Sequence, residues 1–162
     1  MYRWILFLHI LSAFIFMIAH GASANITFKL RQQTSREGIA ALLDLSSAHI
    51  PPMYVALLTM LLTGIVLGFL GRWWRQGWIW ASLGLLVAEF FAMWYMASVP
   101  LSQVRKAVGL PYFENMKPQP AVAPAPADEI AARVAALKPL PVAFVGFGGL
   151  GLIVWLMMFK PF

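Results

Sequence analysis

Four long stretches of this sequence carry almost no charge, and they limit its possible folds more than any other feature. They cover residues 4–28, 52–71, 77–99 and 141–159. Each approaches or exceeds the roughly 20 apolar residues that a helix needs to cross about 30 Å of hydrocarbon. A spanning segment must be helical, because no water is present there to satisfy backbone amides. The pattern predicts an all-α integral membrane four-helix bundle, a single transmembrane domain over residues 1–162.

The composition agrees with this prediction. Hydrophobic residues make up 61% of the chain and charged residues only 11%, whereas soluble domains are about 25% charged. The formal charge of +6 comes from basic residues near the ends of the apolar stretches, where anionic lipid headgroups favour them. We therefore expect contact with a lipid bilayer and no binding to nucleic acid. The absence of cysteine excludes disulfides and thiolate sites.

The first apolar stretch has two interpretations. Ala22-Ser23-Ala24 matches the A-x-A cleavage site of a secretory signal peptide. However, the uncharged run from Trp4 to Phe28 is longer than the ~7–15 apolar residues of a signal core. We therefore expect a retained transmembrane helix.

The first connection contains a predicted short helix. Thr34-Ser35-Arg36-Glu37 fits the T-x-x-E capping box, with Thr34 as the cap. An amphipathic segment follows, and we expect a helix over about residues 35–48 that lies on the membrane surface. Pro51 and Pro52 then start the second span.

The other two connections differ in length. Residues 72–77 predict a tight hairpin whose tryptophans lie at headgroup level. Residues 117–126 are rich in Pro and Ala and predict an extended linker. Asp128 is then the expected cap of a second amphipathic surface helix, over about residues 128–138.

Three ionisable residues lie inside the predicted spans: His9, His20 and Glu89. The two histidines share a helix face about 16 Å apart, too far to bind one metal ion, and no metal site is expected. His20 and Glu89 differ in depth by about one turn, which predicts a buried polar pair joined by a hydrogen bond. We favour a role in fixing helix register over a proton relay.

A cofactor is the alternative interpretation of the histidines. His20 or His9 would then be the axial ligand of a haem or a chlorophyll-type pigment. Membrane b-type haems use two facing histidines, and His49 is expected at the membrane surface, above His20. Met60 lies at a more suitable depth for a His/Met pair.

Glycines recur within two of the spans. Those predicted to pack helices are Gly64, Gly68, Gly146, Gly148, Gly149 and Gly151. The last four match the letters of G-x-G-x-x-G, but a dinucleotide site requires that motif to follow a strand. Inside an apolar span, glycines instead allow helices to approach closely.

Several short segments carry a family resemblance: Leu8-His9, His20-Gly21, Thr63-Gly64 and the closing residues 156–161. With them the chain resembles a bacterial family of predicted integral membrane proteins of unassigned function. That family is similar in outline to copper-resistance D-type four-helix membrane proteins. The resemblance implies four spans, a histidine-dependent role and the bacterial inner (cytoplasmic) membrane.

Orientation follows from the distribution of Lys and Arg. Four lie on the side of the two termini and eight in the first and third connections, so the positive-inside rule predicts that both termini are outside.

The sequence contains no hydrolase triad, P-loop or carboxylate cluster, so we expect no enzymatic activity. Our preferred hypothesis is a non-catalytic accessory subunit that packs against other integral membrane subunits of a respiratory or photosynthetic complex. One alternative is an electron-transfer protein that binds its cofactor through His20 or His9. Another is a small transporter or proton-handling protein centred on Glu89.

Overall fold

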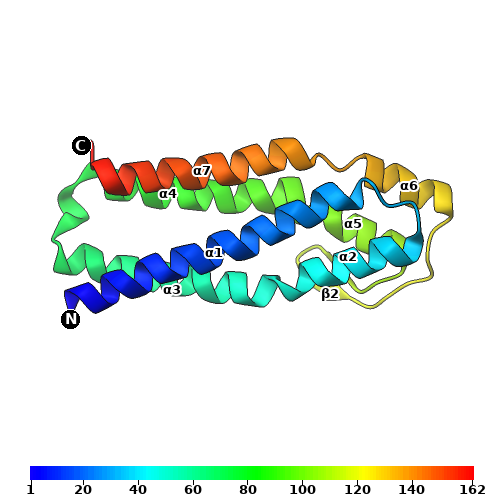
Figure 1. Ribbon diagram of the computed structural model, residues 1–162, viewed down its shortest axis with the longest axis horizontal. Coiled ribbons are helices and arrows are strands. Elements are labelled where there is room, and N and C mark those ends of the chain that lie inside the picture. The colour runs from blue at the N-terminus through cyan, green and yellow to red at the C-terminus, as the bar shows by residue number, and fades with distance from the viewer.

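The computed structural model describes all residues from Met1 to Phe162, and Figure 1 shows an elongated helical bundle. Its helices are α1 (Tyr2–Leu30), α2 (Arg36–Ala48), α3 (Ile50–Leu70), the 3₁₀ turn η1 (Trp73–Arg75), α4 (Gly77–Met93), the π-helical turn η2 (Trp94–Ser98), α5 (Val99–Val108), α6 (Ala127–Ala135) and α7 (Pro139–Phe159). The strands are β1 (Tyr112–Glu114) and β2 (Lys117–Gln119), which pair antiparallel.

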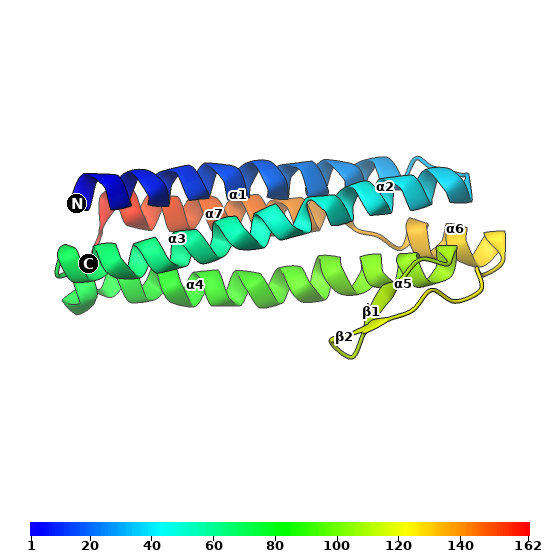
Figure 2. The same cartoon turned by 90° about the horizontal axis from the view of Figure 1, so that it is seen from below.

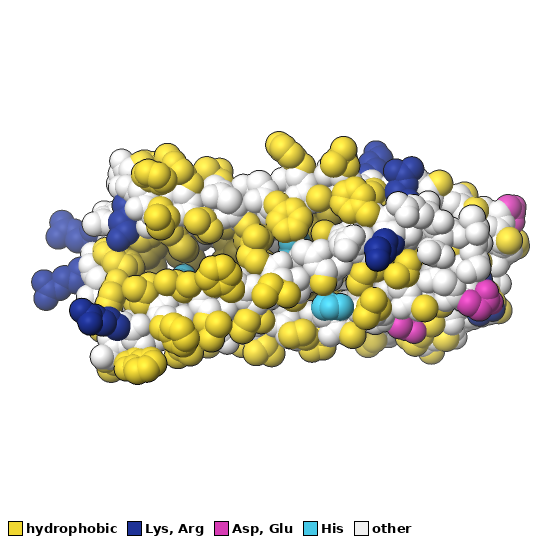
Figure 3. All heavy atoms as spheres, in the orientation of Figure 1, with side chains coloured by type: hydrophobic (Ala, Val, Ile, Leu, Met, Phe, Trp, Pro, Cys, Tyr) yellow, Lys and Arg dark blue, Asp and Glu magenta, His cyan; other side chains and the backbone are white.

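Four stretches are long and apolar enough to cross a membrane: Tyr2–Leu30, Arg36–Leu70, Gly77–Val108 and Ala127–Phe159. This confirms the predicted helical bundle with four candidate spans. The two termini lie at the same end of the bundle as the α3–α4 turn, as Figure 1 shows. Figure 3 shows apolar side chains over most of the bundle, with Lys and Arg concentrated towards its two ends.

The four long helices associate as two pairs. Helix α1 packs mainly along α3, and α4 packs mainly along α7 (Figure 1). A smaller contact between α1 and α7 joins the pairs. The α3–α4 hairpin was predicted correctly as a tight turn, in which Arg72 adopts the left-handed backbone conformation.

The largest buried cluster lies at the end of the bundle opposite the termini. We call α2, α5, α6 and the β1–β2 hairpin the cap. One cluster of ten apolar residues joins α1, α2, α5, α6 and Leu137, which closely follows α6. Its members are Ile26, Leu30, Ile39, Leu43, Val104, Ala107, Val108, Ile130, Val134 and Leu137. The cap therefore has a core of the kind found in water-soluble domains.

The cap corrects the prediction that two amphipathic helices lie on the membrane surface. Both helices exist, but their apolar faces are buried in the same cluster. The buried residues are Ile39 and Leu43 of α2, and Ile130 and Val134 of α6. Their apolar faces are therefore covered by protein and not by lipid. Helix α2 also continues in the direction of α3 instead of turning aside (Figure 2).

Both predicted helix caps are wrong by one or two residues. Ser35, not Thr34, caps α2, because its side chain accepts a hydrogen bond from the Gly38 amide at 3.2 Å. Helix α6 begins at Ala127, so Asp128 lies inside the first turn without making a capping hydrogen bond. A carboxylate in a first turn is still favourable, because it faces the positive end of the helix dipole.

The third candidate span extends beyond its predicted end at residue 99. Pro100 lies in the first turn of α5, where its missing N–H costs little. The preceding π-helical turn absorbs the irregularity, and the Val99 amide bonds to the Trp94 carbonyl five residues earlier. The helical path therefore continues without a break into the cap.

Part of the predicted linker forms a β-hairpin. Asn115 and Met116 both have positive φ angles, as a two-residue type I′ turn requires. The Ser102 hydroxyl of α5 donates to the Phe113 carbonyl and accepts from the Phe113 amide, both at 2.7 Å. These bonds fix β1 to the cap, and the hairpin projects beside the bundle (Figure 2).

Candidate functional site

A cavity of about 170 Å³ lies between the two helix pairs. Its wall includes residues of α1, α3, α4 and α7, and fifteen of its 21 lining residues are hydrophobic. Among the others are one histidine and one carboxylic acid, His20 and Glu89. Both are buried, with exposed fractions of 8% and 9%. The fold therefore brings together two of the three ionisable residues that the sequence placed inside the spans.

The imidazole of His20 is held by aromatic rings from two helices. Phe16, one turn earlier on α1, stacks on it with ring centroids 5.8 Å apart. Phe147 of α7 meets it edge-on at 5.5 Å. A Cβ atom at Gly146 would lie only 2.5 Å from His20 Nε2. Glycine at 146 is thus what lets the imidazole lie directly against the backbone of α7.

The carboxyl group of Glu89, a residue of α4, packs against α7 as the His20 imidazole does, but about one turn further along α7. A Cβ atom at Gly149 would lie 2.7 Å from Glu89 Oε2. Gly146 and Gly149 are three residues apart, about 4.5 Å along the axis. The imidazole and the carboxyl group therefore pack against the same face of α7 at neighbouring levels.

These two groups are not satisfied by the protein. His20 Nε2 and Glu89 Oε2 are buried and have no hydrogen-bond partner, and the hydrogen bond expected between the two side chains is absent. Leaving a buried polar atom unpaired costs about 1–3 kcal/mol, and such atoms are rare in folded proteins. Two of them in the wall of one cavity indicate a place where a polar group can bind.

His9 has a different environment from His20. Its Nδ1 lies 2.9 Å from the Met60 carbonyl, to which it donates, and 3.1 Å from Thr63 Oγ1. These contacts tie α1 to α3, and His9 Cε1 would lie 3.1 Å from a Cβ atom at Gly64. His9 does not line the cavity, so the structure gives it a packing role and separates it from His20.

The six glycines predicted to pack helices differ in their surroundings. Side chains pack on Gly64, Gly68, Gly146 and Gly149, whereas a Cβ atom at Gly148 or Gly151 would meet nothing within 4 Å. Residues three apart share a helix face, so Gly146 and Gly149 point inward while Gly148 and Gly151 are turned away. Their place in the G-x-G-x-x-G pattern carried no information about packing.

A haem or chlorophyll does not fit this cavity. Pockets for drug-sized ligands measure about 300–1,000 Å³, and this cavity is about 170 Å³. His20 is the only histidine in its wall, and the Nδ1 of His49 donates to the Leu45 carbonyl at 2.8 Å. No group of three or more His, Asp or Glu side chains is placed to hold a metal ion.

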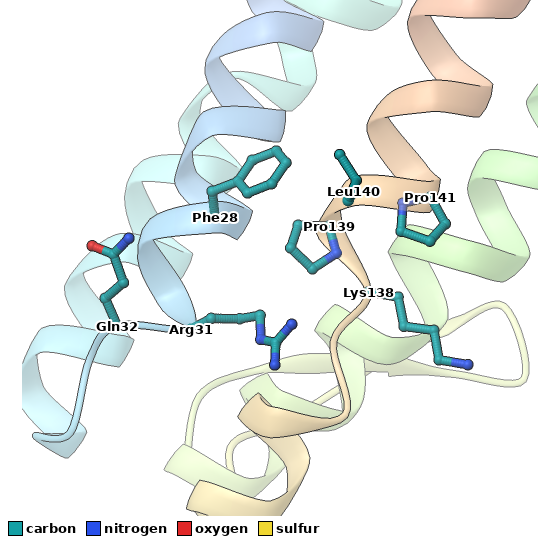
Figure 4. A pocket seen from close by; sticks show the side chains of 7 residues that line it. All are labelled: Phe28, Arg31, Gln32, Lys138, Pro139, Leu140 and Pro141. Carbon is teal, nitrogen blue, oxygen red and sulfur yellow. The ribbon is translucent and has the colours of Figure 1, made fainter.

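A second pocket was not foreseen from the sequence. It lies where α1 ends and α7 begins and includes Arg31 and Lys138 (Figure 4). These residues are far apart in the chain, so only the packing of the two helix ends reveals that they are neighbours.

No protein-family model, curated protein or solved structure matches the chain. The resemblance to copper-resistance D-type proteins therefore stays a prediction.

Proposed function

We propose that this protein is an integral membrane protein that binds a small membrane-soluble ligand, without catalysis, in the cavity between its two helix pairs. Large apolar side chains are exposed along all four candidate spans, and charged groups concentrate towards the two ends of the bundle (Figure 3). The eight basic residues at the cap end favour a cytoplasmic cap and external termini in a bacterial inner membrane.

One observation carries the binding proposal: His20 Nε2 and Glu89 Oε2 are buried, unpaired and in the wall of one apolar cavity. The cavity is close in size to an engineered cavity of about 150 Å³ that binds benzene. The ligand class that fits is a single ring carrying hydrogen-bonding groups. The imidazole and the carboxyl group would bond to those groups while the apolar wall covers the ring.

The cavity wall also reaches the outer surface of the bundle. Tyr54 of α3, Phe90 of α4 and Trp94 of η2 line the cavity, and each is also exposed on the outside. Helices α3 and α4 do not pack extensively along each other. An apolar tail on the ligand would therefore leave between α3 and α4 into the lipid.

Titration with 1,4-benzoquinone, a single ring with two carbonyl acceptors, tests this proposal. The full chain is placed in lipid nanodiscs, and tryptophan quenching is followed, to which Trp94 in the cavity wall contributes. Wild type is expected to show saturable quenching. Glu89→Met keeps the size of the side chain and removes its hydrogen-bonding group, so affinity should fall about tenfold, equivalent to ~1.4 kcal/mol.

Thr59→Val is the matched control, because Thr59 is a polar residue of α3 that does not line the cavity. It should bind as wild type does. Equal affinity in all three proteins, or linear partitioning without saturation in wild type, would contradict the binding site.

The second candidate function is the accessory subunit of a larger membrane complex. It is favoured by apolar side chains exposed outside the candidate spans, on the β1–β2 hairpin. Phe113 and Met116 are 63% and 79% exposed there, and the hairpin projects from the cap (Figure 2). Such a surface suits contact with another membrane subunit.

A further inference from the structure

The second pocket lies at the boundary between the apolar bundle and the cap. It measures about 470 Å³ and is formed by the end of α1, the residues just after it, and the first turn of α7. Figure 4 shows Phe28 and Leu140 on the side of the spans and Arg31 and Lys138 towards the cap. The pocket is therefore apolar towards the bundle and basic towards the cap.

The two basic groups of this pocket have no acidic partner. The three ion pairs of the protein join Arg105 to Asp44, Lys106 to Glu114 and Arg133 to Glu129. No carboxylate lies within ion-pair distance of Arg31 or Lys138, and both side chains are exposed. Two unneutralised cations thus belong to residues that line one pocket, while three other cations of the cap are paired.

The start of α7 makes side chains, not backbone amides, the main recognition groups here. Proline occupies positions 139 and 141 in the first turn of α7, and proline has no N–H to donate. An anion in this pocket would therefore bind chiefly to the guanidinium of Arg31 and the ammonium of Lys138. Guanidinium groups bind phosphate in a bidentate manner, and an ammonium group adds a point charge.

We propose that this pocket binds the phosphate of an anionic phospholipid from the leaflet next to the cap. Arg31 and Lys138 contact the phosphate, and the acyl chains run along Phe28 and Leu140 towards the bundle. The proposal rests on the membrane insertion proposed above, which places this boundary at headgroup level. Basic pockets between helix ends on the cytoplasmic side commonly bind anionic headgroups in this way.

Native mass spectrometry of the full chain in detergent, with added lipid, tests the proposal. Phosphatidylglycerol is compared with phosphatidylcholine, which has the same phosphate but no net charge. Wild type should retain one phosphatidylglycerol at concentrations at which phosphatidylcholine is lost. The double variant Arg31→Gln with Lys138→Gln should bind phosphatidylglycerol about tenfold or more weakly, since each cation contributes appreciably near a lipid surface.

Lys29→Gln with Lys117→Gln is the matched control. It removes the same charge from the same end of the protein, and neither residue lines the pocket. This variant should retain phosphatidylglycerol as wild type does. An equal loss in both double variants would show that general charge attracts the lipid, and would overturn the site.

Two further experiments test whether the site binds free phosphate instead of lipid, and whether the protein inserts into a membrane at all. Millimolar inorganic phosphate should leave the bound lipid in place, whereas displacement would identify a site for free phosphate and overturn the lipid assignment. The proposed membrane insertion is tested separately by incorporation into phosphatidylcholine nanodiscs. If the protein incorporates into nanodiscs but shows no preference for phosphatidylglycerol in the mass spectra, only this site is overturned. If the protein fails to incorporate, the insertion proposal is overturned.

Discussion

Arg105 connects the two halves of the cap, and its replacement by alanine is expected to release α2 from α5. Its Nε donates to the Pro111 carbonyl at 2.7 Å, and its Nη1 donates to the Leu43 carbonyl at 3.1 Å and to Ser47 Oγ at 2.9 Å. Its Nη2 forms an ion pair with Asp44 at 3.1 Å. One side chain of α5 therefore holds three residues of α2.

The size of the effect follows from the burial of these contacts. The side chain of Arg105 is only 18% exposed, while that of Asp44 is 59% exposed. The ion pair itself should therefore contribute less than about 1 kcal/mol. Hydrogen bonds from a charged donor contribute about 1.5–3 kcal/mol each, and water replaces part of this after substitution. We expect Arg105→Ala to destabilise the cap by about 3–5 kcal/mol.

None of the seven tryptophans lies in the cap, so tryptophan fluorescence would not report on its unfolding. Hydrogen exchange of the α2 amides is the suitable assay. At about 1.4 kcal/mol per tenfold, protection factors of the slowest α2 amides should fall roughly 100- to 4,000-fold. The control is Arg133→Ala, which removes an exposed i,i+4 ion pair of α6 and should cost less than about 1 kcal/mol. Similar protection in the two variants would refute the assignment of Arg105 as the connecting residue.

Two further predictions concern packing and association. Gly146→Ala places a methyl group against His20 and should cost about 1–3 kcal/mol, whereas Gly148→Ala meets nothing. Thermal unfolding in detergent should give a Tm about 2–12 °C lower for Gly146→Ala than for Gly148→Ala, and equal values would contradict the tight contact. Purification from native membranes in mild detergent should recover larger subunits at constant stoichiometry, and less of them when Phe113 and Met116 are both replaced by serine. Consistent recovery of an isolated wild-type monomer would count against the accessory-subunit hypothesis.

The apolar part of each candidate span was predictable, because crossing hydrocarbon imposes a minimum apolar length on a helix. The last three candidate spans extend well beyond their predicted boundaries at residues 52, 99 and 141, where the helical path continues into the cap. The cap was not predictable in the same way. Ile39 and Leu43 in α2 form the same periodic pattern whether the apolar face meets lipid or another helix. The hairpin was missed because its turn uses Asn115-Met116 instead of the Asn-Gly pair that usually signals a type I′ turn.

The candidate site was predictable only in its components. An ionisable residue inside an apolar span is expected to face the interior. This selected His20 and Glu89, but also His9, which packs against α3 outside the cavity. Their surroundings depend on how each helix is rotated about its axis, which the sequence of one chain does not specify. For the same reason the Arg31–Lys138 pocket had no recognisable signal, since neither residue is unusual at the end of an apolar stretch.

The π-helical turn at residues 94–98 lies between α4, which belongs to the bundle, and α5, which belongs to the cap. A π turn contains about one residue more than an α turn, and each residue of a helix is rotated by about 100°. The stripe of residues facing inward is therefore rotated between the two sides of the turn. Before it, Glu89 and Met93 line the cavity, and after it, Val104 and Val108 fill the cap core. The turn therefore changes which residues of this helical path face inward. The section before it lines the cavity, and the section after it packs into the core of the cap.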